Sequence, residues 1–183
     1  AHAARLGLDV VVLDHHQANP ELPAVVAVVN PNRQDDLSGL GALAACGVSF
    51  MAMVALLRTL RRRGFFKVRV EPDLLALLDL VALGTVADVV PLTGLNRAFV
   101  TRGLAVAKMR RNAGLAALST VARLSGPPSA YHLGFLIGPR INAGGRIGNA
   151  ALGARCLMSD DAAAAEAIAR ELDDLNKERQ ALE

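Results

Sequence analysis

Two short apolar runs near the N-terminus alternate with polar segments, and each run ends abruptly in polar residues. Residues 9–13 and 24–29 are rich in valine and lack the regular polar alternation of a half-exposed strand. Continuous β-branched runs of this length are typical of strands buried on both faces of a parallel sheet. We therefore expect two buried parallel strands, with Asp14 and Asn30 immediately beyond their carboxyl ends.

Farther along the chain the apolar positions follow the helical period, so the expected fold class changes from α/β to mainly α. Helices are expected over 47–64, 71–84 and 95–124, the last one interrupted near Asn112, and again from residue 149 onward. Loops are expected over the intervening segments 85–97 and 125–148, the second of which is rich in glycine and proline.

The last expected helix begins after Ser159-Asp160-Asp161, a sequence typical of a helix N-cap. We therefore expect a boundary between residues 1–158 and a helix over residues 159–183 that connects to a further domain. Both ends of the sequence lie inside expected elements, and two strands do not make a stable parallel sheet alone. We therefore expect a piece of a longer protein.

Composition narrows the class of protein without indicating its chemistry. Hydrophobic residues make up 52% of the chain and aromatic residues 3%, which predicts an ordered core of small aliphatic side chains. The net charge of +3 permits an anionic partner but does not require one. No apolar run reaches the length of a membrane span. Cys46 and Cys156 lie in apolar helical contexts, so we expect reduced thiols and a cytoplasmic location, with no membrane association.

The triplet Asp14-His15-His16 at the end of the first strand is the first candidate site. Ligands of open α/β sheets bind beyond the carboxyl ends of the strands, and imidazole with carboxylate suits a divalent metal such as Mn²⁺. Successive residues leaving a strand point in different directions, so one imidazole could bind metal while the other faces a phosphate. A polar turn with two structural histidines explains the same triplet equally well.

Two later features add to this picture. Asp88 lies between apolar runs, where burial of a carboxylate is costly unless it is paired or bound to metal, so it is a candidate metal ligand; a helix N-cap or a salt-bridge partner is the structural alternative. Residues 138–148 combine glycines with two arginines, as anion sites do. This segment lacks the Lys-Ser/Thr of a P-loop, and a surface loop with two arginines is the alternative.

Taken together and in this order, the segments resemble those of the DHH phosphoesterases. The segments are DVVVLDHH, NPN, LVALGTVADVVPLTGLNR, GPRINAGGRIG and LDDLNKERQ. Within that superfamily they are most similar to the RecJ family of bacterial exonucleases, and the resemblance covers essentially the whole chain. It implies metal-dependent 5′→3′ hydrolysis of single-stranded DNA to 5′-mononucleotides, in DNA repair and recombination.

The resemblance also implies roles for individual residues, around a pair of Mn²⁺ or Mg²⁺ ions. His15 and Asp88 correspond to metal ligands, Asp14 to a group that supports the histidine, and His16 to a residue that faces the scissile phosphate. The residues that would meet nucleic-acid phosphate are His16, Arg140, Asn142, Gly144, Gly145 and Arg146. Of the two arginines we favour Arg146, which follows the glycine pair, and we expect Arg140 to be partly buried. The Asn30-Pro31-Asn32 turn is expected to shape the site.

The sequence also departs from the family pattern. It lacks the Asp-x-Asp metal motif, the separate bridging aspartate, the DHH-associated domain and the OB-like nucleic-acid module. We therefore expect the 183-residue chain alone to be inactive and its parent to be the nuclease, with single-stranded DNA as partner and repair or replication proteins as further candidates. The alternatives are a DHH phosphodiesterase of short oligonucleotides or cyclic dinucleotides, and a non-catalytic DHH-like nucleic-acid-binding subunit.

Overall fold

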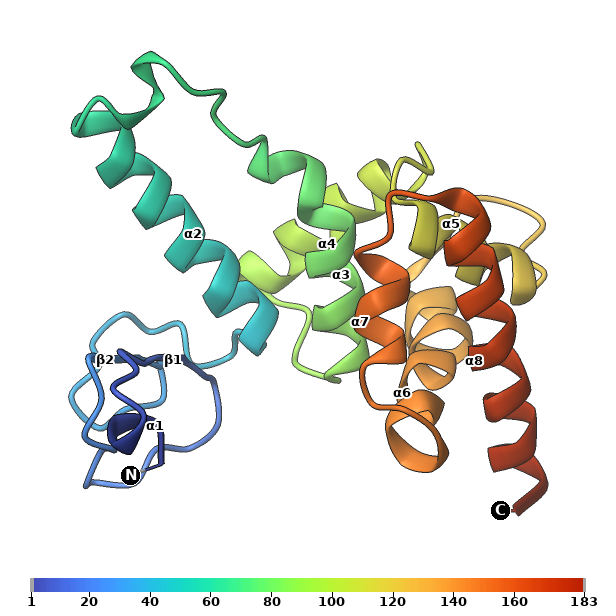
Figure 1. Cartoon of the computed structure of the whole chain (residues 1–183), viewed down its shortest axis with the longest axis horizontal. Coiled ribbons are helices and arrows are strands. Elements are labelled where there is room, and N and C mark those ends of the chain that lie inside the picture. Colours follow the sequence, from blue (N-terminus) through green and yellow to red (C-terminus); the bar gives the residue numbers. More distant parts are fainter. Residues whose placement is uncertain (1, 183) are drawn as a thin grey trace.

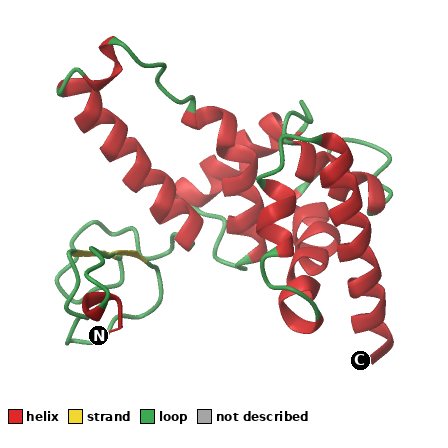
Figure 2. Ribbon diagram, in the orientation of Figure 1, coloured by secondary structure: helices red, strands yellow, loops and turns green. Residues whose placement is uncertain are grey.

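The computed structural model describes residues 2–182, which form a small N-terminal sheet region and a larger helical part (Figure 1). The sheet region contains α1 (His2–Arg5), β1 (Val11–Leu13) and β2 (Ala27–Val29). Its two strands are parallel, with Val12 opposite Val28. They are the only strands in residues 2–182, and helices dominate the rest (Figure 2). The expected change from α/β to mainly α is confirmed.

The two strands are shorter and more exposed than their sequences predicted. Each covers three residues of its expected run, and Val11, Val26 and Val29 are 55%, 64% and 42% exposed. A continuous apolar run becomes buried only where other elements cover it on both faces. A sheet of two strands lacks that cover, so the expectation of burial on both faces is wrong for this chain.

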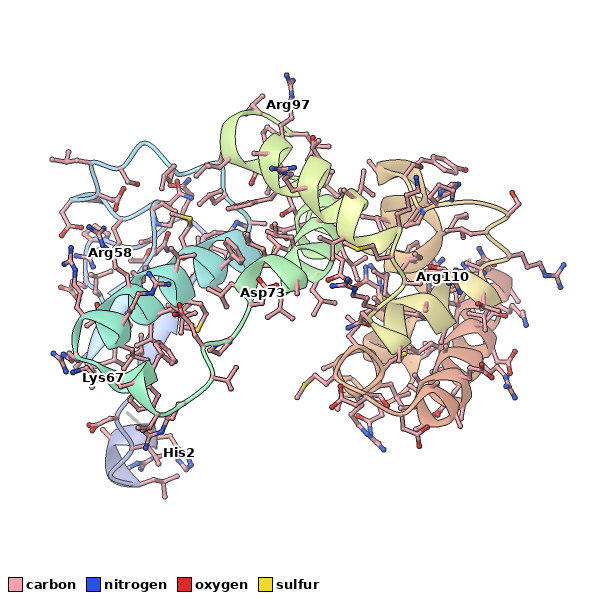
Figure 3. The ribbon with its side chains drawn as sticks, turned by 90° about the horizontal axis from the view of Figure 1, so that it is seen from above. His2, Arg58, Lys67, Asp73, Arg97 and Arg110 are labelled. Atoms are coloured by element: carbon pink, nitrogen blue, oxygen red, sulfur yellow. The ribbon has the colours of Figure 1, made fainter. Side chains whose placement is uncertain are left out.

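A long helix, α2 (Ala45–Arg62), follows the sheet region and projects away from the C-terminal helices, so that its outer end lies on the same side of the molecule as the sheet (Figure 1). It stops where the sequence predicted, because Gly64 adopts the left-handed conformation (φ 74°) that glycine tolerates best. Figure 3 shows Arg58 and Lys67 at this outer end, and both side chains are exposed. The basic run 61–63 therefore belongs to a solvated helix end.

A close crossing of α3 (Leu78–Ala87) and α4 (Gly94–Ala107) forms the centre of the molecule. The short helices η1 (Phe65–Lys67) and η2 (Leu74–Leu77) precede it. A Cβ at Gly103 of α4 would overlap the carbonyl oxygen of Leu78, so glycine is required for this approach. Helix α3 continues through residues 85–87, where a loop was expected, and the loop to α4 covers only residues 88–93.

The remaining helices of residues 2–182 pack around the end of α3 and enclose the main core (Figure 1). They are α5 (Ala113–Val121), the π-helix η3 (His132–Ile137), α6 (Gly138–Ile147), α7 (Leu152–Leu157) and α8 (Ala162–Leu182). Leu118, Leu133, Ile137 and Leu172 are fully buried there. This core is built from aliphatic side chains, as the composition predicted.

The last helix, α8, lies against α5, α6 and α7. Asp161 caps it, since its carboxylate accepts a hydrogen bond from the N–H of Ala163 at 2.8 Å. The predicted N-cap is confirmed. Ala165, Ala169 and Leu172 form the buried stripe of this helix. The domain boundary after residue 158 stays a prediction.

Helix α6 replaces much of the irregular structure that was expected over residues 125–148. Pro139 lies in its first turn, where the missing N–H leaves no hydrogen bond broken. A Cβ at Gly144 would come within 2.9 Å of the Leu172 side chain, so this glycine allows α6 to lie close to α8. Tertiary packing therefore stabilises a helix whose glycines disfavour it locally.

Two smaller expectations concern thiols and membranes. Cys46 and Cys156 are both free, and burial raises the pKa of each thiol. Among residues 2–182, no helix combines the length and hydrophobicity needed to cross a bilayer.

Candidate metal centre

The loop that follows β1 is organised by the carboxylate of Asp14. Its Oδ1 atom accepts hydrogen bonds from the backbone N–H groups of His15 and His16, at 2.8 and 3.2 Å. The same oxygen lies 2.7 Å from Nδ1 of His16. The hydrogen bond to His16 and those to the two backbone amides lower the pKa of Asp14, and the same carboxylate raises the pKa of His16. Asp14 therefore favours a protonated His16 and fixes the direction of its ring.

Two asparagines beyond β2 hold this loop in place. The side-chain amide of Asn30 donates to the carbonyl oxygen of His16 at 2.9 Å. The side-chain amide of Asn32 donates to the carbonyl oxygens of His15 (2.7 Å) and Gly41 (2.9 Å). Asn30 is 4% exposed, so its polar groups depend on these partners. The end of β2 thus pins the end of β1, which agrees with the shaping role expected for this turn.

His15 and Asp88 meet at the junction of the sheet region and α3. Nε2 of His15 lies 3.2 Å from Oδ2 of Asp88, although 73 positions (88 − 15) separate them in the sequence. Asp88 directly follows the last residue of α3, and Val89 beyond it has a positive φ of 60°. The side chain of His15 is 14% exposed and that of Asp88 is 39% exposed.

Asp88 is paired with His15, but it is not buried as its sequence context suggested. Its apolar sequence neighbours suggested a carboxylate inside the core, whereas helix α3 ends just before it and releases its side chain at the surface. Val86 is partly buried, while Val89 on the other side is 87% exposed. Apolar flanking residues therefore did not predict the environment of this carboxylate.

The facing atoms of His15 and Asp88 suit one divalent cation. Two ligands about 2.1 Å from an octahedral ion, and at right angles to each other, lie roughly 3.0 Å apart. The observed separation is 3.2 Å, and imidazole nitrogen with carboxylate oxygen is a donor set that Mn²⁺ accepts. Residues 2–182 contain no group of three or more His, Cys, Asp or Glu side chains placed to hold a metal. The pair fits part of a metal site.

The ring of His16 lies beside that of His15 but has a different partner. It is held by Asp14, its side chain is 79% exposed, and its centroid lies 4.5 Å from that of His15. The supporting contact from Asp14 to His15 is made to the backbone N–H, because the carboxylate binds the ring of His16 instead.

The arginines of residues 138–148 have different environments. Nε of Arg140 lies 2.8 Å from Oδ1 of Asp173 on α8, and Nη1 donates to the carbonyl oxygen of Leu136 at 2.6 Å. The side chain of Arg140 is 16% exposed, so its expected partial burial is confirmed. Arg146 lies exposed in the last turn of α6. Burial raises the pKa of Asp173, but hydrogen bonds and charges from Lys177 and Arg140 outweigh it and leave that pKa lowered.

The other predicted phosphate contacts also lie on α6. Asn142 and Gly145 are exposed, whereas Gly144 is buried against Leu172. Because Gly144 and Gly145 are helical, the flexible loop expected to approach an anion is absent here. No hydrogen bond or ion pair within residues 2–182 joins α6 to Asp14, His15, His16 or Asp88.

Sequence reasoning missed two buried polar residues that position these elements. Asp173 forms an ion pair with Arg140. It belongs to the segment LDDLNKERQ, for which the family resemblance implied no role for this carboxylate. Asn96 on α4 is 1% exposed and donates to the carbonyl oxygens of Ala42 (2.6 Å) and Pro91 (2.9 Å). It thereby ties the loop after Asp88 to the segment before α2. The available signal was an asparagine among apolar helical positions.

Comparison with known proteins gives relatives along the whole chain. Residues 1–85 match the family described as "DHH family, N-terminal domain". The chain is 44% identical over 185 aligned residues to the single-stranded-DNA-specific exonuclease RecJ of Dickeya dadantii, and 42% identical over 186 to that of Escherichia coli. These alignments cover 99% and 100% of the chain, but the chain spans about a third of the length of these relatives (32% of each).

Solved structures agree with the sequence relatives. A crystal structure of exonuclease RecJ bound to manganese superposes with a TM-score of 0.82 at 38% identity, over 99% of this chain and 43% of that one. The structure of RecJ from Thermus thermophilus in complex with Mn²⁺ superposes with a TM-score of 0.81 at 39% identity. This match covers 97% of this chain and 25% of that one. Residues 1–85 therefore match the N-terminal domain of the DHH family, and the chain as a whole is similar to part of the RecJ exonucleases.

Proposed function

We propose that this chain supplies part of the metal centre of a 5′→3′ exonuclease that degrades single-stranded DNA to 5′-mononucleotides. The observation that carries the proposal is the approach of His15 to Asp88, two donors from distant segments that face each other 3.2 Å apart. The relatives named above are exonucleases specific for single-stranded DNA, and two of the similar structures contain manganese. The alternative of two purely structural side chains explains neither similarity.

In this proposal His15 and Asp88 hold one of a pair of Mn²⁺ or Mg²⁺ ions. When bound, such ions polarise a phosphodiester oxygen and activate water for in-line displacement. Nε2 of the His15 ring faces Asp88, while Asn32 and Asp14 bind the His15 backbone. These contacts fix the backbone from which the ring projects.

His16 contacts the scissile phosphate in this proposal. Asp14 contacts its Nδ1 atom and raises its pKa, which favours the imidazolium form and leaves Nε2 available as a donor. A protonated imidazole beside a phosphodiester offsets negative charge that develops during hydrolysis. Asp14 thus acts through His16 as a positioning residue.

Arg146 is the preferred arginine for the nucleic-acid phosphate, together with the exposed neighbours Asn142 and Gly145 on α6. It is exposed, whereas Arg140 is committed to Asp173. Gly144 contributes by packing, since it brings α6 close to α8. The proposal therefore keeps Arg146, the arginine that the sequence favoured, as the phosphate ligand and gives Arg140 and Gly144 structural roles.

Residues 2–182 bring no third such donor to this pair, and two donors do not hold a pair of ions, so further ligands would come from another part of a longer protein. We therefore propose that the chain alone is inactive and that it acts within a protein about three times as long, as in the relatives. Residues 1–158 and the helix from 159 would then be the end of one catalytic lobe and its connection to another. A cytoplasmic location suits two unpaired thiols and a DNA substrate, and repair or replication proteins are the partners we would seek.

The test is Mn²⁺-dependent degradation of 5′-phosphorylated single-stranded DNA by the full-length protein that carries this chain. Release of mononucleotides should be lost in His15→Ala and Asp88→Ala and retained in the matched control His2→Ala, which changes an exposed histidine of α1. The isolated chain should show no activity.

Two other outcomes would replace the proposal. An intact full-length protein that binds but does not degrade single strands would support the non-catalytic subunit. Efficient cleavage restricted to dinucleotides or cyclic dinucleotides would support the phosphodiesterase alternative.

A further inference from the structure

Two aromatic rings are stacked on the surface of η3. Tyr131 directly precedes this π-helix and Phe135 lies within it, and their ring centroids are 5.1 Å apart with only 26° between the planes. Tyr131 is 60% exposed and Phe135 is 70% exposed. The pair therefore presents a stacked aromatic surface to solvent.

The chain has only six aromatic side chains of Phe and Tyr type (five and one), and Tyr131 and Phe135 are more exposed than Phe65 (41%) and Phe99 (7%). Phe99 is 7% exposed and packs edge-on against Phe50 in the core near α2. Burying a Phe side chain is worth about 1.5–3 kcal/mol, and the core of this protein is otherwise filled by smaller residues. Two large rings left outside the core, in contact with each other, point to a role beyond folding.

A different face of η3, that of Gly134 and Gly138, rests on the end of α3, which stops just before Asp88. A Cβ at Gly134 would come within 3.2 Å of Val86, and one at Gly138 within 3.5 Å of Ala87. These glycines let the π-helix lie directly on the last turn before Asp88, and π-helical turns are frequent at functional sites. The exposed rings are thus carried by the element adjacent to the candidate metal centre.

We propose that Tyr131 and Phe135 form a platform on which bases of a single-stranded nucleic acid stack as the strand enters the metal centre. This rests on the function proposed above and adds the surface that holds the bases. Flat aromatic faces bind bases of any sequence, which is the usual way that proteins hold single strands without sequence preference. The near-parallel rings continue the geometry of a base stack, and the element that carries them contacts the last turn of α3, which ends just before Asp88.

The chain itself provides the probe for this platform. It has no Trp and its only Tyr is Tyr131, so its tyrosine fluorescence reports on one ring of the pair. The 183-residue chain is titrated with oligothymidylate in low salt and EDTA, and separately with an abasic deoxyribose-phosphate oligomer of equal length. Oligothymidylate should quench the fluorescence, whereas the abasic oligomer, which has the same charge, should leave it unchanged.

A substitution in the second ring tests the stacking. Phe135→Leu keeps an apolar side chain but removes one aromatic face, and it should weaken oligothymidylate binding roughly 5- to 100-fold. Phe65→Leu is the matched control, since Phe65 is 41% exposed in η1, which follows α2, and should not affect binding.

Three outcomes would overturn the platform. They are equal quenching by the abasic oligomer, no quenching by oligothymidylate, and an unchanged affinity in Phe135→Leu. If Phe135→Leu lowers only the melting temperature of the full-length protein, the rings instead pack against another part of that protein. The readout requires neither metal nor cleavage, so an inactive full-length protein whose chain still shows base-dependent quenching would refute the nuclease and retain the platform.

Discussion

Replacing Arg140 by Met should destabilise this protein, although Arg140 belongs to a segment that resembles a phosphate-binding motif. Its guanidinium lies 2.8 Å from Asp173, and the two side chains are only 16% and 13% exposed. The substitution keeps most of the aliphatic length of Arg140 and removes the charge. Asp173 would then retain a single cation, Lys177, whose side chain is 63% exposed.

The magnitude follows from this burial. Removing one partner of a fully buried ion pair costs about 3–5 kcal/mol, because the other charge is left unpaired in the interior. Lys177 still neutralises part of the charge on Asp173, at 2.8 Å from Oδ2. We therefore expect a loss of about 2–3 kcal/mol, which includes the hydrogen bond from Arg140 to the carbonyl oxygen of Leu136. For a domain of this size the melting temperature should fall by roughly 4–12 °C.

The assay is thermal unfolding followed by circular dichroism, with two matched controls. Arg170→Ala removes an exposed pair with Glu166, whose side chains are 67% and 56% exposed, and should cost less than about 0.5 kcal/mol. Arg146→Met changes the exposed arginine of the same helix as Arg140 and should also leave stability nearly unchanged. A melting temperature of Arg140→Met equal to those controls, together with weaker DNA binding by the full-length protein, would refute our reasoning and make Arg140 a phosphate ligand.

Other substitutions test the packing and the ion pair separately. Gly103→Ala should destabilise the protein by roughly 2–3 kcal/mol in urea unfolding, because its Cβ would overlap the carbonyl oxygen of Leu78; a neutral effect would contradict the close helix crossing. Gly145→Ala should stabilise it by about 0.5–1 kcal/mol, since nothing lies within 4 Å of that Cβ and alanine favours the helix; a loss would contradict this. The pKa of Asp173 is lowered below its ordinary value of 3.8, so its contribution to stability is complete above about pH 3.8 and is lost as the pH falls through the folded-state pKa. The difference in stability between wild type and Asp173→Asn should therefore shrink below that pH, and a constant difference would refute the ionic origin.

Local signals in the sequence predicted much of the helical part. The interruption near Asn112 is a true helix start, since the Asn112 side chain accepts a hydrogen bond from the N–H of Leu115 at 2.8 Å. The cap at Asp161 and the left-handed Gly64 are equally local. Such signals require only neighbouring residues, which is why a single sequence contains them.

The features that the sequence did not predict depend on distant residues. Helix α6 forms despite its glycines because Gly144 packs on Leu172, which lies 28 positions later (172 − 144). The valines of the strands are exposed because burial depends on elements that cover a sheet, which a valine-rich run cannot specify. The tie between Arg140 and Asp173 likewise spans two helices.

In the candidate site too, the sequence predicted the features that depend on neighbouring residues and not those that depend on distant ones. The placement of Asp14, His15 and His16 at the end of a strand followed from pattern, whereas the meeting of His15 with Asp88 was expected only from the family resemblance. The exposure of Asp88 was missed, because its apolar neighbours do not reveal that α3 ends there. The stacked rings of Tyr131 and Phe135 were missed because an i, i+4 aromatic pair in a glycine-rich segment gives no indication of exposure.

The most direct test of the central claim is calorimetric Mn²⁺ binding to the full-length protein, compared among wild type, His15→Ala, Asp88→Ala and His2→Ala. We predict that His15→Ala and Asp88→Ala each weaken binding of at least one ion by more than about tenfold, a loss already typical of groups that only support a ligand. His2→Ala should bind as wild type does. Unchanged Mn²⁺ affinity in both variants would contradict the account and leave His15 and Asp88 as a hydrogen-bonded pair without a metal.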